Sequence, residues 1–422
     1  MRGRLQLLID QLPQSLWPIP ALGVVTAVVA HVILLSIDHR LDEETARWFV
    51  FGGGAGSARS VLETMATSML SMTTVVFSIT MLVLQLAASQ LSPRVLSTFL
   101  RDRRNQVVLA LFISTYAYVL LTLREIRDDF VPGLSVWAAF VAVMLSVAAF
   151  VYYVHHIAQS IRVVTVVQRV ANDARRAIER LYPSAIGEPA PVEAVHGLPE
   201  GEPDRTYRWP AASGVVVSVR DEELARICRE SGAFVRLRVA IGDFVGRGSR
   251  IAMAWGEDAP EDDALLGTIV VGAERTVSQD ALYGFRQLVD IAVRALSPGV
   301  NEPTTATQVL DQLHGLLLEL SEREIPPSVR ADEHGRSFLE LPRPGWDAYV
   351  ALSLDEIRVD GRDSVQVRRR LRVLIEDLIE RAPESRLPSL RRQWRQLDAI
   401  EATLPAHQRS VLGPPQGHAP ST

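Results

Sequence analysis

The chain has 422 residues and a mass of 46.6 kDa, which is long enough for two or three folded units. Its residues are 48% hydrophobic and 22% charged, with a net charge of −5, which excludes a disordered chain and gives no electrostatic reason to bind nucleic acid. All 44 basic residues are arginine, so chemistry that needs a lysine amine is excluded, and the single cysteine, Cys228, excludes an intrachain disulfide and a cysteine-based zinc site.

The apolar residues are concentrated in the first 160 residues, although the mean hydropathy of the whole chain is only +0.13. Four stretches there are long enough to cross a bilayer as helices, which takes about 20 residues. We therefore predict a transmembrane domain over residues 1–160, with spans at about 17–37, 65–88, 106–123 and 132–154.

Arginines flank these spans unevenly. Eleven lie in the segments before the first span, between the second and third, and after the fourth, whereas five lie in the two loops on the other side. Because positively charged loops stay in the cytoplasm, the count predicts that both termini and everything after residue 155 lie in the cytoplasm.

The second span carries a stripe of small polar residues. Thr64, Ser71, Ser78 and Gln85 recur every seven residues, and Thr67 and Thr74 fall on nearly the same face. One interpretation is a pore lining, in which hydroxyl groups replace part of an ion's hydration shell. The other is a packing seam between membrane helices, which is a common use of Ser and Thr.

Charged residues are missing from the middle of all four predicted spans, which argues against a proton pump or a voltage sensor. His31 lies inside the first span without a second metal ligand at a useful spacing, so we interpret it as a hydrogen-bonded packing residue. The glycine-rich run 52–56 lacks the lysine of a phosphate-binding loop and is interpreted as a flexible lead into the second span.

The cytoplasmic part is predicted to begin with a helical stalk over 161–181 and a proline-rich linker over 182–211. A β unit follows over 212–275, with strands at 214–219, 234–240, 250–255 and 266–272 and a helix at 221–232. The piece around GDFVGRG (242–248) resembles half of the barrel-sandwich hybrid fold of biotinyl and lipoyl domains. Those domains modify a lysine, which this chain lacks, and Cys228 is expected to be a buried structural thiol.

A helical and α+β unit is predicted over 276–404, and the tail 405–422 is predicted to be disordered. Thr276 and Gln279 fit a capping box that opens a helix ending near Leu296. In the connection 297–306, Gly299 is expected to take a positive φ, and Thr304 or Asn301 to cap the next helix, which runs to about Leu320.

This helical hairpin is expected to be structural. It contains carboxylates and hydroxyls, but the local sequence fixes no spacing between a base and a nucleophile that would indicate a catalytic site. Its distinctive residues are Gln279, Asp280, Arg286, Asp290, Arg294, Pro298, Gly299, Asn301, Pro303 and Thr304. Two further amphipathic helices are predicted at 364–382 and 388–402, whose arginine runs 368–370 and 391–392 suit either anionic lipid heads or solvent.

Several stretches together resemble one bacterial family. They are SMTTVVFSITMLVLQLAASQLSPRVL (71–96), LRDRRNQVVLALFISTYAYVLLTL (100–123), GVVVSVRDEEL (214–224), GDFVGRG (242–248) and VSQDALYGFRQLVDIAVRALSPGVNEPTTA (277–306). The chain resembles, over roughly residues 10 to 400, the predicted membrane proteins classed as domain of unknown function 2254. The resemblance implies a multi-pass inner-membrane protein and no established activity.

Two functions suit this sequence. The first is a homo-oligomeric channel or pore with a cytoplasmic regulatory domain. The second is a membrane-anchored scaffold or sensor whose cytoplasmic domain binds a partner or a small ligand. We expect no enzymatic activity, no cofactor and no metal, because the nine histidines show no metal-ligand pattern and no catalytic spacing is visible. The lipid bilayer and further copies of the chain are the expected partners.

Overall fold

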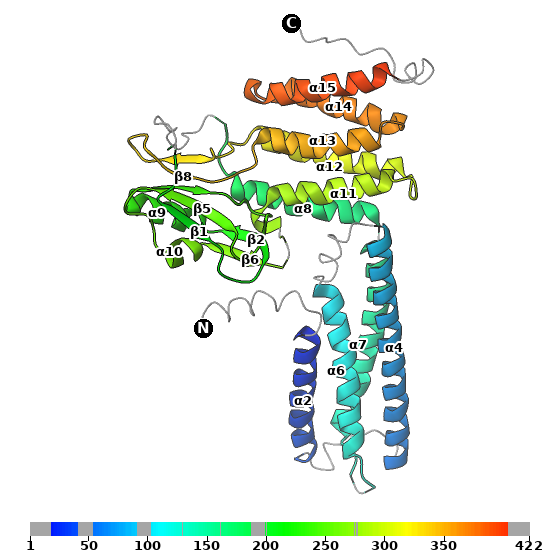
Figure 1. Ribbon diagram of the computed structural model, residues 1–422. Coiled ribbons are helices and arrows are strands. Elements are labelled where there is room, and N and C mark those ends of the chain that lie inside the picture. The colour runs from blue at the N-terminus through cyan, green and yellow to red at the C-terminus, as the bar shows by residue number, and fades with distance from the viewer. Residues whose placement is uncertain are drawn as a thin grey trace. The chain divides into compact units, whose positions relative to one another are not determined.

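The computed structural model describes residues 18–40, 54–90, 103–128, 130–160, 162–186, 199, 201–273, 275 and 277–403. The chain divides into two compact units, Met1–Thr165 and Val166–Thr422 (Figure 1). The predicted tail 405–422, the middle of the predicted linker (187–198), the first two glycines of the run 52–56, and Thr276 lie outside the described residues.

The first unit contains four long apolar helices: α2 (Pro18–Asp38), α4 (Ala55–Gln90), α6 (Arg103–Glu125) and α7 (Gly133–Ser160). All four are long and apolar enough to cross a membrane, which confirms the four predicted spans. Helix α4 begins ten residues before the predicted start of its span, at 65. The expectation of a flexible lead over 52–56 is therefore wrong for Ala55 and Gly56, which are already helical.

The helices of the first unit bury one shared apolar cluster, in which α6 packs against each of the other three. Leu62, Met69 and Phe112 are fully buried in it. Gly23 of α2 lets α2 approach α6 closely, because a Cβ there would lie 3.1 Å from the carbonyl oxygen of Ala110 on α6.

The second unit is an α+β fold. Its helices are α8 (Val163–Leu181, whose first turn belongs to the first unit), α9 (Asp221–Ser231), α10 (Asp262–Leu266), α11 (Ala281–Leu296), α12 (Pro303–Ser321), α13 (Trp346–Asp360), α14 (Val365–Arg381) and α15 (Leu387–Ala402). Short 3-10 turns precede α11 (Val277–Gln279) and α15 (Glu384–Arg386). The predicted helices at 221–232, 364–382 and 388–402 are confirmed within one or two residues.

The strands are β1 (Arg205–Arg208), β2 (Gly214–Val219), β3 (Phe234–Leu237), β4 (Phe244–Val245), β5 (Arg250–Trp255), β6 (Ile269–Gly272), β7 (Val329–Ala331) and β8 (Ser337–Glu340). They form a five-stranded sheet in the order β1-β5-β3-β8-β7 and a three-stranded sheet in the order β4-β2-β6. Only the β3–β8 pair is parallel among these strands.

Three strands of the larger sheet, β1, β7 and β8, come from outside the predicted β unit. Strand β1 lies within the predicted linker 182–211, and it is a strand because Tyr207 is fully buried and pairs with Ala252. Strand β8 comes from the 276–404 region and pairs with β3, so the β unit is completed by residues a hundred positions away. Cys228 of α9 is buried in the cluster beneath these strands, and burial raises the pKa of its thiol to about 12.

The remaining helices of the second unit stack on one another, with α11 packed on α12 and α13 and these in turn on α14 and α15 (Figure 1). Helix α8, predicted as a stalk, buries its apolar face within this unit: a Cβ at Gly284 of α11 would lie 2.7 Å from the Cβ of Ala174. Tyr182, which follows α8, and Tyr349 of α13 are joined by a buried hydroxyl–hydroxyl bond of 2.9 Å.

Candidate functional site

The polar stripe of α4 lies on the outside of the first unit. Its members Thr64, Thr67, Ser71, Thr74, Ser78 and Gln85 are all exposed. The hydroxyl groups each donate to the carbonyl oxygen four residues earlier in α4, at 2.8–2.9 Å. None of these hydroxyls bonds to another helix among the described residues.

The face of α4 that packs against the other helices is opposite to this stripe. Its buried residues are Ala58, Leu62, Ala66, Met69, Val76 and Val83. At 100° per residue, they point about 180° away from the stripe. On this inner side the Thr80 hydroxyl lies 2.6 Å from the Tyr153 hydroxyl, which also donates to the Val76 carbonyl oxygen at 3.2 Å. These bonds and the apolar packing fix which face of α4 is turned outward.

The spacing along the outer face is regular. From Ser60 the positions 64, 67, 71, 74, 78, 81 and 85 follow in alternating steps of four and three residues, and all are exposed. Only Met81 among them is apolar. An alternating step of three and four keeps one seam turned toward a parallel neighbour in a left-handed helix pair or ring. The outer face of α4 therefore carries one continuous line of positions with this spacing.

His31 is buried, as expected of a packing residue. Its Nδ1 lies 3.4 Å from the Thr122 hydroxyl, and its ring meets Tyr118 edge-on. Near it, both carboxylate oxygens of Asp38 accept backbone N–H groups from the start of α7, at 2.9 and 3.0 Å, and one accepts the Ser135 hydroxyl at 2.6 Å. Asp38 thus caps α7 and ties α2 to it.

The first of the motif residues in the second unit lie at the start of α11. Asp280 is the N-cap: its Oδ1 accepts the Tyr283 N–H at 3.0 Å, and its Oδ2 accepts Arg275 at 2.5 and 3.1 Å. Burial raises the pKa of the Asp280 carboxyl, and the bonds from Arg275 oppose that rise. Gly242, with φ of 97°, leaves room for Arg275, because a Cβ there would overlap the guanidinium.

This geometry corrects the predicted capping box. Val277–Gln279 is a 3-10 turn and Gln279 is exposed, while the nearer and buried carboxylate of Asp280 takes the capping role. The connection to α12 is corrected as well. Asn301, with φ of 48°, takes the left-handed conformation in place of Gly299, and Glu302 precedes α12 without a side-chain cap, so neither Thr304 nor Asn301 caps it.

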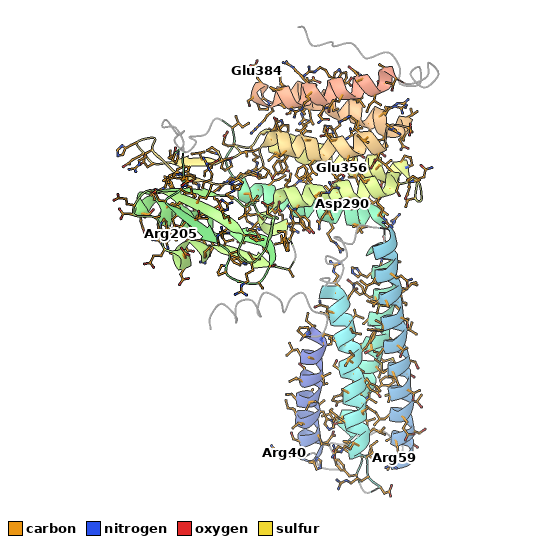
Figure 2. The ribbon with its side chains drawn as sticks, viewed as in Figure 1. Arg40, Arg59, Arg205, Asp290, Glu356 and Glu384 are labelled. Carbon is orange, nitrogen blue, oxygen red and sulfur yellow. The ribbon has the colours of Figure 1, made fainter. Side chains whose placement is uncertain are left out.

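The remaining motif residues divide between one ion-pair ladder and one exposed loop. Arg286 pairs with Asp290 on α11 at 2.5 Å and with Glu356 on α13, so it joins two layers of the stack. Figure 2 labels the two carboxylate residues on their helices. These carboxylates raise the pKa of Arg286. The exposed residues are Arg294, Pro298, Gly299, Asn301 and Thr304, with Pro303 half-buried at the first turn of α12.

One polar cluster was not apparent from the sequence. His314 of α12 contacts Asp377 of α14 through Nε2 at 2.6 Å and Arg370 through Nδ1 at 2.9 Å. A neutral ring with its proton on Nε2 satisfies both partners, because Nε2 then donates to the carboxylate and Nδ1 accepts from the guanidinium. Burial, and then the Arg370 charge, lower the pKa of His314, and Asp377 opposes them. Partners 56 and 63 residues apart leave no local pattern in the sequence.

The part of the chain that the structure describes contains no group of three His, Cys, Asp or Glu side chains that could hold a metal ion. Four apolar helices followed by an α+β unit define a multi-pass membrane protein. The chain belongs to the family described as predicted membrane protein (DUF2254), which matches residues 13–377.

Among curated proteins it is similar to the uncharacterised proteins Mb1321c of Mycobacterium bovis and Rv1290c of Mycobacterium tuberculosis. Each is 33% identical over 375 residues, which cover 86% of this chain and 71% of the relative. No solved structure matches the chain.

Proposed function

We propose that the protein is a homo-oligomeric channel whose pore is lined by the outer face of α4, with the second unit as a cytoplasmic regulatory domain. The observation that carries this proposal is the position of the polar stripe, which lies opposite the packing face of α4 and has no partner helix within the described residues.

Lipid is a poor environment for this face. Backbone bonds satisfy the hydroxyl donors, but each hydroxyl oxygen keeps acceptor capacity, and the amide of Gln85 has two N–H donors and a carbonyl that hydrocarbon cannot satisfy. Exposed apolar residues such as Leu70, Phe77 and Leu82 flank the stripe on α4. A ring of α4 helices around an axis would turn the polar face toward water and leave the apolar flanks for neighbouring helices and lipid.

The spacing supports parallel copies. A closed ring places identical helices side by side in the same direction, and the alternating steps of three and four residues give each pair one continuous contact line. The hydroxyl groups would then stand in successive layers along the axis, where they can replace part of an ion's hydration shell. With the orientation inferred from the arginine count, the second units would lie on the cytoplasmic side of a bacterial inner membrane.

Conductance across planar bilayers containing the purified protein tests this function. We expect currents that Ser71→Leu/Ser78→Leu abolishes. The matched control is Thr26→Leu/Ser36→Leu, which replaces two exposed hydroxyls of α2 that also bond to their own helix. Currents that are equally sensitive to both pairs, or insensitive to the α4 pair, would contradict the assignment of the pore wall.

Oxidative crosslinking tests the assembly separately. Because the only native thiol, Cys228, is buried, Ser71→Cys is expected to form disulfide-linked dimers in membranes, whereas Ser36→Cys is not. Silence across voltage, tension and pH, without crosslinking at position 71, would favour the membrane-anchored scaffold or sensor.

A further inference from the structure

A cluster of arginines surrounds one turn of the second unit, between β4 and β5. Arg208 and Arg250 are register partners at the ends of β1 and β5, and the Arg208 Nη1 donates to the Gly248 carbonyl oxygen at 2.8 Å. Arg247 is the neighbour of Gly248 in the turn. Arg238 follows β3, and its backbone N–H donates to the Ile251 carbonyl oxygen at 2.8 Å. We call Arg208, Arg238, Arg247, Arg250 and Phe244 the basic turn surface.

The four guanidinium groups are exposed and, among the described residues, none of them forms an ion pair. Other arginines of the same sheet are paired: Arg205 with Asp262 and Arg236 with Glu340. The acid nearest in sequence, Asp243, directs Oδ2 to the backbone N–H of Ala240 at 2.9 Å. The basic turn surface therefore carries a concentrated positive charge.

An exposed aromatic side chain lies three residues before Arg247 in the chain, on β4. Phe244 is 73% exposed, whereas its neighbour Val245 on β4 is buried. No other large apolar residue described in the second unit is as exposed. Leaving a phenylalanine in water forgoes about 1.5–3 kcal/mol of burial free energy. Its exposure, three residues before Arg247, favours a binding partner that is both apolar and anionic.

We propose that the basic turn surface binds the anionic headgroups of a lipid bilayer, with the Phe244 ring entering the interfacial layer. Arginines near an anionic bilayer attract its phosphate groups, and an aromatic ring partitions into the headgroup region. The chain supplies proximity, since α7 ends at Ser160 and the second unit begins at Val166. A tether of at most about 20 Å keeps a bilayer at high effective concentration for every copy of the second unit.

The full-length protein carrying Phe244→Cys, labelled with an environment-sensitive aromatic fluorophore, tests the contact in nanodiscs. The buried Cys228 thiol, whose pKa burial raises to about 12, stays unlabelled. We expect a blue-shifted emission, and quenching by spin-labelled lipid chains, in discs with phosphatidylglycerol but not in discs of phosphatidylcholine alone. Salt should weaken both signals, since it screens exposed charges.

Charge removal supplies the control. Arg208→Gln/Arg247→Gln/Arg250→Gln should reduce the equilibrium constant for contact with the bilayer by about fivefold for each arginine. Arg205→Gln/Arg220→Gln/Arg226→Gln removes the same charge from exposed ion pairs elsewhere in the second unit and should leave the signals unchanged. Equal signals in both disc types, or equal loss in both triple variants, would overturn the proposal. So would an emission change caused by soluble inorganic phosphate or heparin but not by anionic lipid.

Discussion

Replacing Asp280 tests whether the motif at the start of α11 acts through one carboxylate. Asp280→Ala removes the N-cap, which costs about 1 kcal/mol, and two hydrogen bonds to a guanidinium that is 31% exposed, which cost about 1.5 kcal/mol. The sum of about 2.5 kcal/mol corresponds to a loss of about 5–10 °C in Tm for a unit of this size.

Asp280→Asn separates the contribution of the N-cap from that of the hydrogen bonds to Arg275. Asparagine keeps an acceptor for the Tyr283 N–H but loses the charge that holds Arg275, so we expect about 1.5 kcal/mol in place of 2.5. Thermal unfolding of the full chain in detergent, followed by intrinsic fluorescence, measures both variants. If asparagine is as damaging as alanine, the capping role is refuted.

A double-mutant cycle then tests the link to Gly242. A Cβ at position 242 displaces Arg275, so Gly242→Ala already breaks part of what Asp280→Asn breaks. We expect the double variant to be more stable than the sum of the single losses by at least about 0.5 kcal/mol. Strict additivity would show that Gly242 and Asp280 do not act through the same guanidinium.

Three further predictions rest on single contacts. Tyr153→Phe should cost about 0.5–1.5 kcal/mol, because it removes the bond to Thr80, and a thermal-melt loss above about 3 kcal/mol would contradict this contact as the cause. The pKa of His314 is lowered in the folded chain, so the unfolded chain takes up a proton first as the pH falls below 6.5. The Tm should therefore fall below pH 6.5 and level off below the folded-state pKa, and His314→Gln should remove this pH dependence. A pH profile of Tm that the substitution leaves unchanged would refute the prediction. Asn301→Gly should be nearly neutral and Asn301→Val should cost about 1–2 kcal/mol, because φ is 48°, and equal melting temperatures for both variants would exclude the left-handed conformation.

The positions of most helices and strands follow from hydrophobic periodicity, because burial of one face requires it. The direction in which the polar stripe of α4 faces does not follow from periodicity. Hydroxyl residues occur on both faces of α4, with Thr80 turned inward to Tyr153 and Ser71 turned outward. Only the packing of four helices selects the inner face, and that selection depends on side chains from α6 and α7.

Local rules also fail where two candidates compete. Two helix starts fit the sequence: a capping box of Thr276 with Gln279, or an N-cap at Asp280. The structure uses Asp280, whose buried carboxylate lies beside Arg275. Likewise, Gly299 and Asn301 both tolerate a positive φ, and the exact course of the connection chooses Asn301. Strand β1 lies in a segment that the sequence predicts to be a linker, because four residues next to several prolines carry too little periodic signal.

The hydroxyl bonds of α4 also bear on its mechanics. Each of these hydroxyls shares a carbonyl oxygen with the backbone N–H of the same turn, and such shared acceptors loosen the helical hydrogen bonds. The shared carbonyls are most frequent along the outer face of α4, while the inner face is held by apolar packing. The helix should therefore bend most easily on the side that bears the stripe. A force on α4 is expected to curve the helix on that side while its contacts with α6 and α7 stay in place.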